Sequence, residues 1–105
     1  MENKVKHTVT GDKIIIEMLT NRFTHDLVEV LKNAYPHTTL IEYDEVEFNL
    51  HQIKMIDSSS IGFLFETHNK LSADGKPKLT ISVGDNTELR ELLRKFQVDL
   101  LLRVK

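Results

Sequence analysis

Residues 48–62 read FNLHQIKMIDSSSIG and contain the pattern on which the predicted fold depends. This stretch overlaps a segment in which Val46, Phe48 and Leu50 alternate with polar residues, the period of a strand with one buried face. It ends with Asp57, three serines and the first residues of an apolar helix pattern. Side chains of these types accept hydrogen bonds from the unpaired N–H groups at a helix start. The pattern therefore predicts a strand leading into a helix that continues to about residue 72.

Outward from this stretch, β-branched and alternating residues predict five strands. They span residues 4–9, 13–18, 40–50, 78–83 and 98–104. The turn Thr10-Gly11-Asp12 joins the first two strands into a hairpin. The run Ile14-Ile15-Ile16 is typical of a strand that is covered on both faces. Residues 37–44 fit either a loop or an added strand, so the sequence leaves this segment open.

Apolar residues at helical spacing predict three helices. They span residues 25–35, the segment after the Asp-Ser cluster up to about 72, and a segment from Asp85 or Asn86 to Phe96. Thr24 is the expected N-cap of the first helix, Pro36 ends it, and ADGKP at residues 73–77 is a turn signal. The second helix is expected to bury Ile61, Leu64, Phe65 and Leu71.

The element order β-β-α-β-α-β-α-β predicts an α/β fold with a mixed β-sheet and helices packed on it. With 105 residues and no linker, the chain is expected to form one domain over residues 1–105. It contains no cysteine, which excludes disulfides and thiolate metal sites and fits a reducing compartment. The five histidines occur at no two-, three- or four-residue spacing, so no metal or cofactor site is predicted.

The charge pattern argues against nucleic acid and membrane as partners. The net charge is −2, with acidic and basic residues interspersed and no basic run of the kind that nucleic-acid binders carry. Residues 1–6 lack the apolar core of a signal peptide, and the longest apolar runs are far too short to span a bilayer. We therefore expect a cytoplasmic protein without direct membrane insertion.

The stretch 48–62 resembles the signature of the STAS family, which comprises the anti-sigma-factor antagonists and related bacterial switch domains. That signature is a hydrophobic strand, a short turn, an Ile-Asp-Ser-Ser-Gly-Leu-Gly-like segment and a helix. The order of elements over almost all of the chain is also similar to the family. The resemblance implies a single STAS-like domain without enzymatic activity, which acts in bacterial signal transduction and transcription regulation by partner switching.

The resemblance also implies a modification site. The serine directly after the motif aspartate Asp57 is Ser58, which a partner serine kinase of the anti-sigma type would phosphorylate and a cognate serine phosphatase would dephosphorylate; Ser59 is the second candidate. The expected partner-binding residues are Asp57, Ser58, Ser59, Ser60, Ile61, Gly62 and Phe63. Ser60 stands where the family has its motif glycine. The family's acidic segment at the first helix is not matched by residues 21–24, and Asp26 is the candidate substitute.

Several alternatives remain open at this level. The Asp-Ser cluster fits a plain helix cap, and the chain fits an unphosphorylated accessory or scaffold subunit of a lipid-transport or sensory assembly. A third alternative is an enzyme that uses Ser58 as its nucleophile. Gly62 fits a close approach by a partner or tight packing within the domain, and Phe63 fits a partner contact or burial. The resemblance implies a monomer, while the strand edges at either end of the sheet leave a dimer open.

Overall fold

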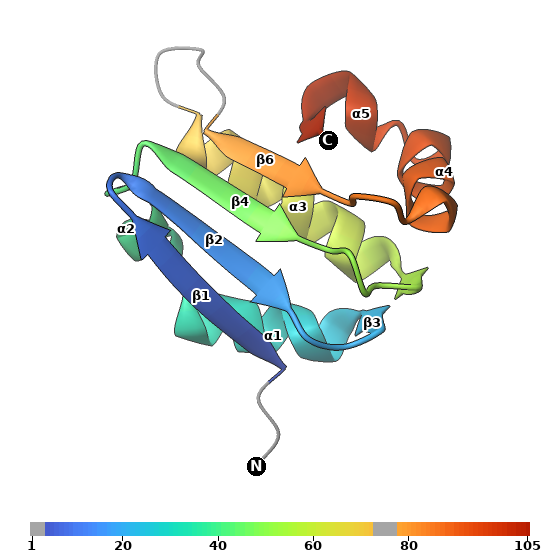
Figure 1. Cartoon of the computed structure of the whole chain (residues 1–105), viewed down its shortest axis with the longest axis horizontal. Helices are drawn as coiled ribbons and strands as arrows, with labels where there is room; N and C mark the ends of the chain where they lie inside the picture. Colours follow the sequence, from blue (N-terminus) through green and yellow to red (C-terminus); the bar gives the residue numbers. More distant parts are fainter. Residues whose placement is uncertain (1–3, 73–77) are drawn as a thin grey trace.

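The central sheet combines an antiparallel hairpin with parallel strands (Figure 1). The computed structural model describes residues 4–72 and 78–105. The sheet contains β1 (Val5–Thr10), β2 (Lys13–Met18), β4 (Glu45–Asn49), β6 (Leu79–Ser82) and β7 (Arg103–Val104). Their order is β1-β2-β4-β6-β7; β1 pairs antiparallel with β2, and every other neighbouring pair is parallel. The expected mixed sheet is therefore confirmed.

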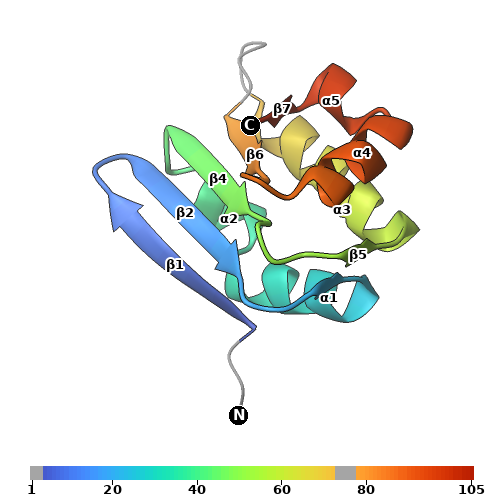
Figure 2. The same cartoon turned by 45° about the vertical axis from the view of Figure 1, so that its right-hand side comes forward.

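The helices lie mainly on one face of this sheet. They are α1 (His25–Ala34), α2 (His37–Leu40), α3 (Ser58–Leu71), α4 (Thr87–Lys95) and α5 (Val98–Leu101). In Figure 1, α1, α2 and α3 lie behind the strands, and both views place α4 and α5 beside β6 (Figure 2). A separate pair of short parallel strands, β3 (Arg22–Phe23) and β5 (Met55–Ile56), precedes α1 and α3. In the described part of the chain, none of these helices is long and apolar enough to cross a membrane.

Two rows of apolar side chains across the sheet form the core against the helices. The strand register aligns Ile14, Val46 and Leu79 in one row and Ile16, Phe48 and Ile81 in the other. All six are buried, and buried leucines of α1 and α3 pack onto them. Burial of each such side chain contributes about 1.5–3 kcal/mol to folding. The alternation predicted around Phe48 is therefore confirmed, and the buried face of β4 fixes where the connection to α3 begins.

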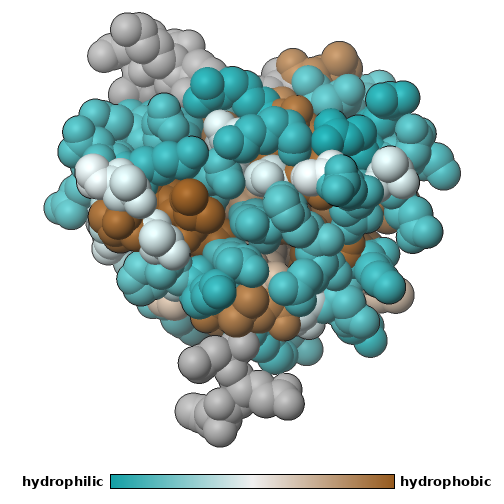
Figure 3. Space-filling view, viewed as in Figure 1, coloured by the Kyte–Doolittle hydropathy of each residue, from teal (hydrophilic) through white to brown (hydrophobic). Residues whose placement is uncertain are grey.

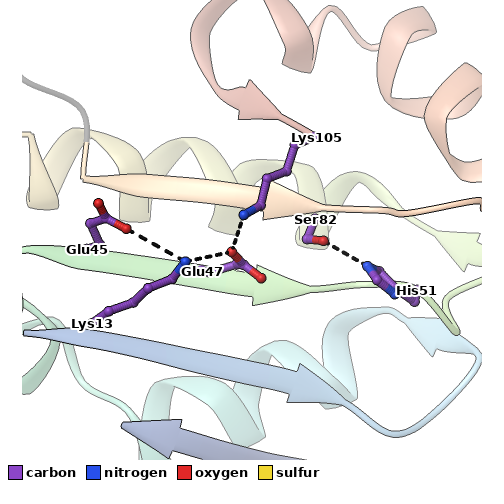
Figure 4. A network of polar contacts seen from close by, with 6 residues as sticks. All are labelled: Lys13, Glu45, Glu47, His51, Ser82 and Lys105. Carbon is purple, nitrogen blue, oxygen red and sulfur yellow. Dashed lines mark hydrogen bonds and ion pairs between the residues drawn. The ribbon is translucent and has the colours of Figure 1, made fainter. Parts of the chain in front are cut away.

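The opposite face of the sheet carries polar side chains, and the face shown in Figure 3 is mostly hydrophilic. Ile15 lies on this side and is half-buried, so the prediction that β2 is covered on both faces was wrong. Glu47 is only 7% exposed. Its Oε1 lies 2.7 Å from the Nζ of Lys105 and 3.2 Å from the Nζ of Lys13, which also lies 3.7 Å from Glu45 (Figure 4). An ion-pair cluster thus joins β2, β4 and the segment after β7.

Two segments differ from the sequence prediction. Residues 37–40 form the short helix α2 rather than a loop or a strand, and the strand that was predicted from residue 40 begins at residue 45. Residues 98–101 form α5, and only Arg103–Val104 pair as a strand. Gln97, with φ at 59°, ends α4 and redirects the chain into α5. The turn predicted at residues 73–77 lies outside the described residues.

The predicted helix cap, the predicted turn and the predicted buried side of α3 can also be compared with the structure. Asn86 is the N-cap of α4, and its side chain accepts from the backbone N–H of Leu89. Gly11 has φ at +60°, as the tight turn between β1 and β2 requires. On α3, Ile61, Leu64 and Leu71 are buried as expected, whereas Phe65 is only half-buried.

Candidate protein-interaction site at the start of α3

The short strands β3 and β5 place two helix starts side by side. Their parallel register pairs Arg22 with Met55 and Phe23 with Ile56. In each case the helix begins two residues after the strand, α1 at His25 and α3 at Ser58. Both helices therefore begin at the same level, and the positive ends of their dipoles lie at the same end of the molecule.

Asp57 caps both of these helices. Its Oδ1 accepts a hydrogen bond from the backbone N–H of Ser60 at 2.9 Å, as an N-cap of α3 does. Its Oδ2 accepts from the backbone N–H of His25, the first residue of α1, at 3.3 Å. Thr24 occupies the N-cap position of α1, but its side chain makes no cap hydrogen bond. The predicted N-cap position is therefore confirmed, but the capping hydrogen bond comes from Asp57 in the neighbouring connection and not from the Thr24 side chain.

Ser60 completes the cap. Its Oγ accepts a hydrogen bond from the backbone N–H of Asp57 at 3.1 Å and donates one to the carbonyl oxygen of Asp57 at 2.8 Å. The Ser60 residue is fully buried. This reciprocal pair is a capping box, which satisfies backbone groups at the helix start. The serine that replaces the motif glycine therefore stabilises the local fold.

The structure separates the predicted site residues into two groups. Ser58 and Gly62 are exposed, and Asp57 and Ser59 are half-exposed. Ser60 is fully buried, and Ile61 and Phe63 are 8% and 3% exposed. A side chain enclosed by its own domain presents little surface to another protein, so partner contact through these three residues stays a prediction.

Phe63 belongs to the aromatic core. Its ring stacks on Phe48 of β4 with 6.0 Å between centroids and meets Phe23 of β3 edge-on at 6.3 Å. Aromatic pairs at such separations contribute about 0.5–1.5 kcal/mol beyond the burial of their area. Phe63 therefore ties the start of α3 to the main sheet and to β3, and it holds the exposed serines in place.

A groove of about 310 Å³ runs between α1 and α3 below the two helix starts. Its polar lining residues are His25, Glu29 and Lys32 from α1 and Ser58, Ser59 and Glu66 from α3. Within residues 4–72 and 78–105, neither the Ser58 nor the Ser59 hydroxyl has a hydrogen-bond partner. The imidazole Nε2 of His25 lies 3.9 Å from a carboxylate oxygen of Glu29. The groove thus combines two free hydroxyls with charges of both signs.

The α1 side of the groove was missed by the sequence analysis. The signal was present as a repeated pattern, because Phe23-Thr24 and Ile56-Asp57 each put an apolar strand residue before a capping residue and a helix. Two such units are brought together only when their short strands pair, and strands of two residues leave almost no periodicity to recognise.

Gly62 borders the groove, and nothing in the domain requires a glycine there. A Cβ built at this position would meet no atom within 4 Å, and the residue lies inside the regular helix α3 with no positive φ. Tight packing within the domain, one of the two explanations left open by the sequence, is therefore not the reason for this glycine. The other explanation, the close approach of a partner, stays a prediction.

His37 lines a neighbouring pocket that shares Glu66 and Lys32 with the groove. Its Nε2 is 3.2 Å from the hydroxyl of Thr67, and its ring stacks on Phe63. Burial and the positive charge of Lys70 hold the pKa of His37 below its ordinary value, although Glu66 acts in the opposite direction. His37 is therefore neutral at pH 7 and adds no charge to the groove.

The chemistry of the site is that of a surface hydroxyl on a rigid frame. Among the described residues no base is hydrogen-bonded to Ser58: the ring of His25 lines the same groove, yet its nearest charged contact is Glu29. A serine nucleophile needs such a base within hydrogen-bond reach. In the described part of the chain, Ser58 is an exposed hydroxyl without that contact.

No family model matches the chain, and no curated protein matches its sequence. Solved structures do match its fold. The anti-sigma factor antagonist SpoIIAA in its unphosphorylated form aligns with a TM-score of 0.68 at 16% identity, covering 96% of this chain and 86% of that one. The phosphorylated form of SpoIIAA, a Bacillus cell fate determinant, aligns with a TM-score of 0.66 at 16% identity, covering 96% and 90%.

A third match is a Thermotoga maritima protein described as a candidate anti-sigma factor antagonist. It aligns with a TM-score of 0.74 at 14% identity, covering 95% of this chain and 84% of that one. These structures define the class: the chain has a STAS-like fold, with a mixed sheet and helices packed on it. More particularly, it is the fold of the anti-sigma factor antagonists.

Proposed function

We propose that this chain is a phosphorylation-controlled protein-binding switch. In its unphosphorylated form it binds a regulator of the serine-kinase or anti-sigma type, and phosphorylation of Ser58 releases that regulator. A cognate serine phosphatase then restores binding. The observation that carries the proposal is the Ser58 hydroxyl, which is exposed at the first residue of α3 and has no hydrogen-bond partner among the described residues.

The three serines differ in how they present their hydroxyls. Ser60 is excluded as an acceptor because its Oγ is buried and makes two hydrogen bonds to Asp57. Ser59 is half-exposed and faces the groove between α1 and α3. Ser58 is the most exposed of the three, so a kinase reaches it with the least rearrangement, and Ser59 remains the second candidate.

A phosphate on Ser58 is compatible with the folded domain. The unpaired N–H groups and the positive dipole end of a helix start favour an anion, typically by 0.3–1 kcal/mol at an exposed site. Here two helix starts, of α1 and α3, lie at the same level. The similarity of this chain to both the unphosphorylated and the phosphorylated form of SpoIIAA supports the same expectation.

The change that a partner meets is therefore one of charge. A phosphoserine adds about −1.5 to −2 charges beside Asp57. An acidic group of the partner about 6 Å away is repelled by roughly 5 kcal/mol at an effective dielectric constant of about 20, before salt screening. After screening, about 1–3 kcal/mol remains, which weakens binding about ten- to a hundredfold.

Substitution of the acceptor tests the proposal. Ser58→Ala is expected to bind the partner as the unmodified wild type does and to stay bound after kinase treatment. Ser58→Asp is expected to weaken binding. The partner to use is a serine kinase of the anti-sigma type from the same organism, with affinity measured by isothermal titration calorimetry. Ser59→Ala is the matched control, because it removes the neighbouring hydroxyl and leaves Ser58 intact. Wild-type affinity for both Ser58 variants, before and after kinase treatment, contradicts the mechanism.

The modification itself is tested by mass. Incubation with the same kinase and ATP is expected to add the mass of one phosphate group, mapped to Ser58 by peptide analysis. If the chain binds this kinase but gains no phosphate, the accessory or scaffold role fits better. A fluorophosphonate probe, which labels activated serine nucleophiles, is expected to leave Ser58 unlabelled.

A further inference from the structure

We propose that the edge strand β1 pairs with β1 of a second copy of this chain, across a two-fold axis at His7, so that one continuous sheet runs through both copies. β1 is the outermost strand on its side of the sheet in both views (Figures 1 and 2), and nothing in the described part of the chain pairs with its outer side. This inference does not depend on phosphorylation of Ser58.

The hairpin determines which backbone groups of β1 are free. The N–H of Leu19 donates to the carbonyl of Lys4, which makes residues 4 and 19 a hydrogen-bonded pair. In an antiparallel ladder such pairs alternate along the strand, so the backbone groups of residues 6, 8 and 10 also point toward β2. The N–H and C=O groups of Val5, His7 and Val9 therefore point outward.

Only one symmetric register pairs all three outward residues. It centres on His7 and sets Val5 of each copy opposite Val9 of the other. Val9 is 47% exposed in the single chain, whereas Val5 is half-buried and packs against the core. Pairing of the two valines covers the exposed one and extends the core across the axis.

The charges in β1 favour the same register. Lys6 lies on the polar face of the sheet, where it forms an ion pair with Glu17 at 3.5 Å. In the register centred on His7, each Lys6 lies opposite Thr8 of the other copy, so no like charges meet. A register shifted so that Lys6 faces Lys6 would set two cations opposite each other.

β1 also lacks the features that usually keep an edge strand from pairing. Its six residues contain no proline, and its register with β2 is continuous, without a bulge. Its lysine does not project from the outer edge, since its backbone groups and its ion pair are both directed at β2. The edge is therefore long, regular and open to a second strand.

The first test is the oligomeric state of the full chain. Sedimentation equilibrium over a concentration series into the millimolar range is expected to show a monomer–dimer equilibrium. Val9→Lys places a cation on the paired edge and is expected to weaken association about tenfold or more. Leu100→Lys is the matched control: Leu100 is 72% exposed on α5, beside the opposite edge of the sheet, and this variant is expected to dimerise like the wild type.

The second test reports the register without relying on affinity. The chain has no cysteine, so single-cysteine variants carry one defined thiol. In His7→Cys, the two Cα atoms lie about 5.5 Å apart across the axis, within the range that a disulfide spans. In Thr8→Cys, each cysteine lies opposite Lys6 of the other copy, so the two thiols do not face each other. His7→Cys is therefore expected to form a disulfide-linked dimer under mild oxidation much faster than Thr8→Cys.

Three results overturn the proposal, provided that circular dichroism shows the variants to be folded. The first is a wild type that stays monomeric at every concentration. The second is a dimer that Val9→Lys leaves intact. The third is equal cross-linking of the two cysteine variants, which would place the contact elsewhere or in another register.

Discussion

Asp57 holds the candidate site together, because each of its carboxylate oxygens caps a different helix. One oxygen receives the N–H of Ser60 in α3, and the other receives the N–H of His25 in α1. Two helix starts that depend on one side chain keep a fixed spacing. The exposed hydroxyl of Ser58 next to this carboxylate is therefore presented in a defined position.

Removal of this carboxylate measures the double cap. Asp57→Ala is expected to lower the free energy of unfolding by about 1–3 kcal/mol, the sum of a lost N-cap and a second lost hydrogen bond. Urea denaturation followed by circular dichroism provides the measurement. Thr24→Ala is the control, since the Thr24 side chain makes no cap bond, and its expected cost is within about 0.5 kcal/mol. Equal losses for the two variants would show that Asp57 does not cap both helices.

Gly62 allows stability and binding to be separated. Gly62→Ala is expected to raise the free energy of unfolding by about 0.5–1 kcal/mol, because alanine favours the helix and its Cβ meets no atom within 4 Å. The same methyl group is expected to weaken the binding of the partner, measured by calorimetry on the unphosphorylated proteins. A more stable variant that binds as tightly as the wild type would remove Gly62 from the interface.

Long elements were predicted from the sequence, and short ones were not. The alternation around Phe48 and the helical spacing from Ile61 to Leu71 extend over enough residues to define a period, and both elements are present. α2 and α5 contain four residues each, about one turn, which is too short to show one. The run from Val98 to Leu102 reads equally as a buried strand or a helix until the backbone of Gln97 is known.

The site was predicted in part for the same reason. Ser58 and Asp57 could be identified because a helix start has a local signature in the sequence. His25 and Glu29 could not, since they reach the groove only through the pairing of β3 with β5. The burial of Phe63 also depends on distant partners, the rings of Phe23 and Phe48.

Glu47 of β4 links β2 to the segment after β7 and gives the fold a defined response to pH. Burial by itself raises the pKa of Glu47, but hydrogen bonds from Lys105 and Lys13 outweigh this effect and hold the pKa below its ordinary value. A carboxylate whose pKa is lowered by folding stabilises the fold above its unfolded pKa. That contribution is lost as the pH falls through the folded pKa.

Glu47→Gln is therefore expected to cost about 1–3 kcal/mol of unfolding free energy at pH 7, the range for hydrogen bonds to charged groups. The difference from the wild type is expected to shrink as the pH falls below the ordinary range for glutamate. Urea denaturation at a series of pH values measures it. Glu45→Gln is the matched control, because Glu45 contacts the same Lys13 but its side chain is 59% exposed, and its expected effect is within about 0.5 kcal/mol. A difference that is constant with pH would exclude the ion pairs as its source.

At the scale of the whole molecule, the proposed interactions lie in different places. The proposed switch site is formed by the starts of α1 and α3, the ion-pair cluster lies on the polar face of the sheet, and the proposed pairing edge is β1. No residue of β1 lines the groove between α1 and α3. A dimer through β1 would therefore carry two accessible Ser58 hydroxyls, and a partner with two binding sites would gain affinity from engaging both.

The pairing of β3 with β5 has a consequence for how a signal leaves this molecule. The two helix starts are anchored to each other and, through Phe63, to the aromatic core. Modification of Ser58 is therefore expected to displace the two helices very little. If this site acts as a switch, the modification therefore changes the charge of the surface while the conformation stays the same. Any protein that reads it must sense the sign of one small area rather than a rearrangement.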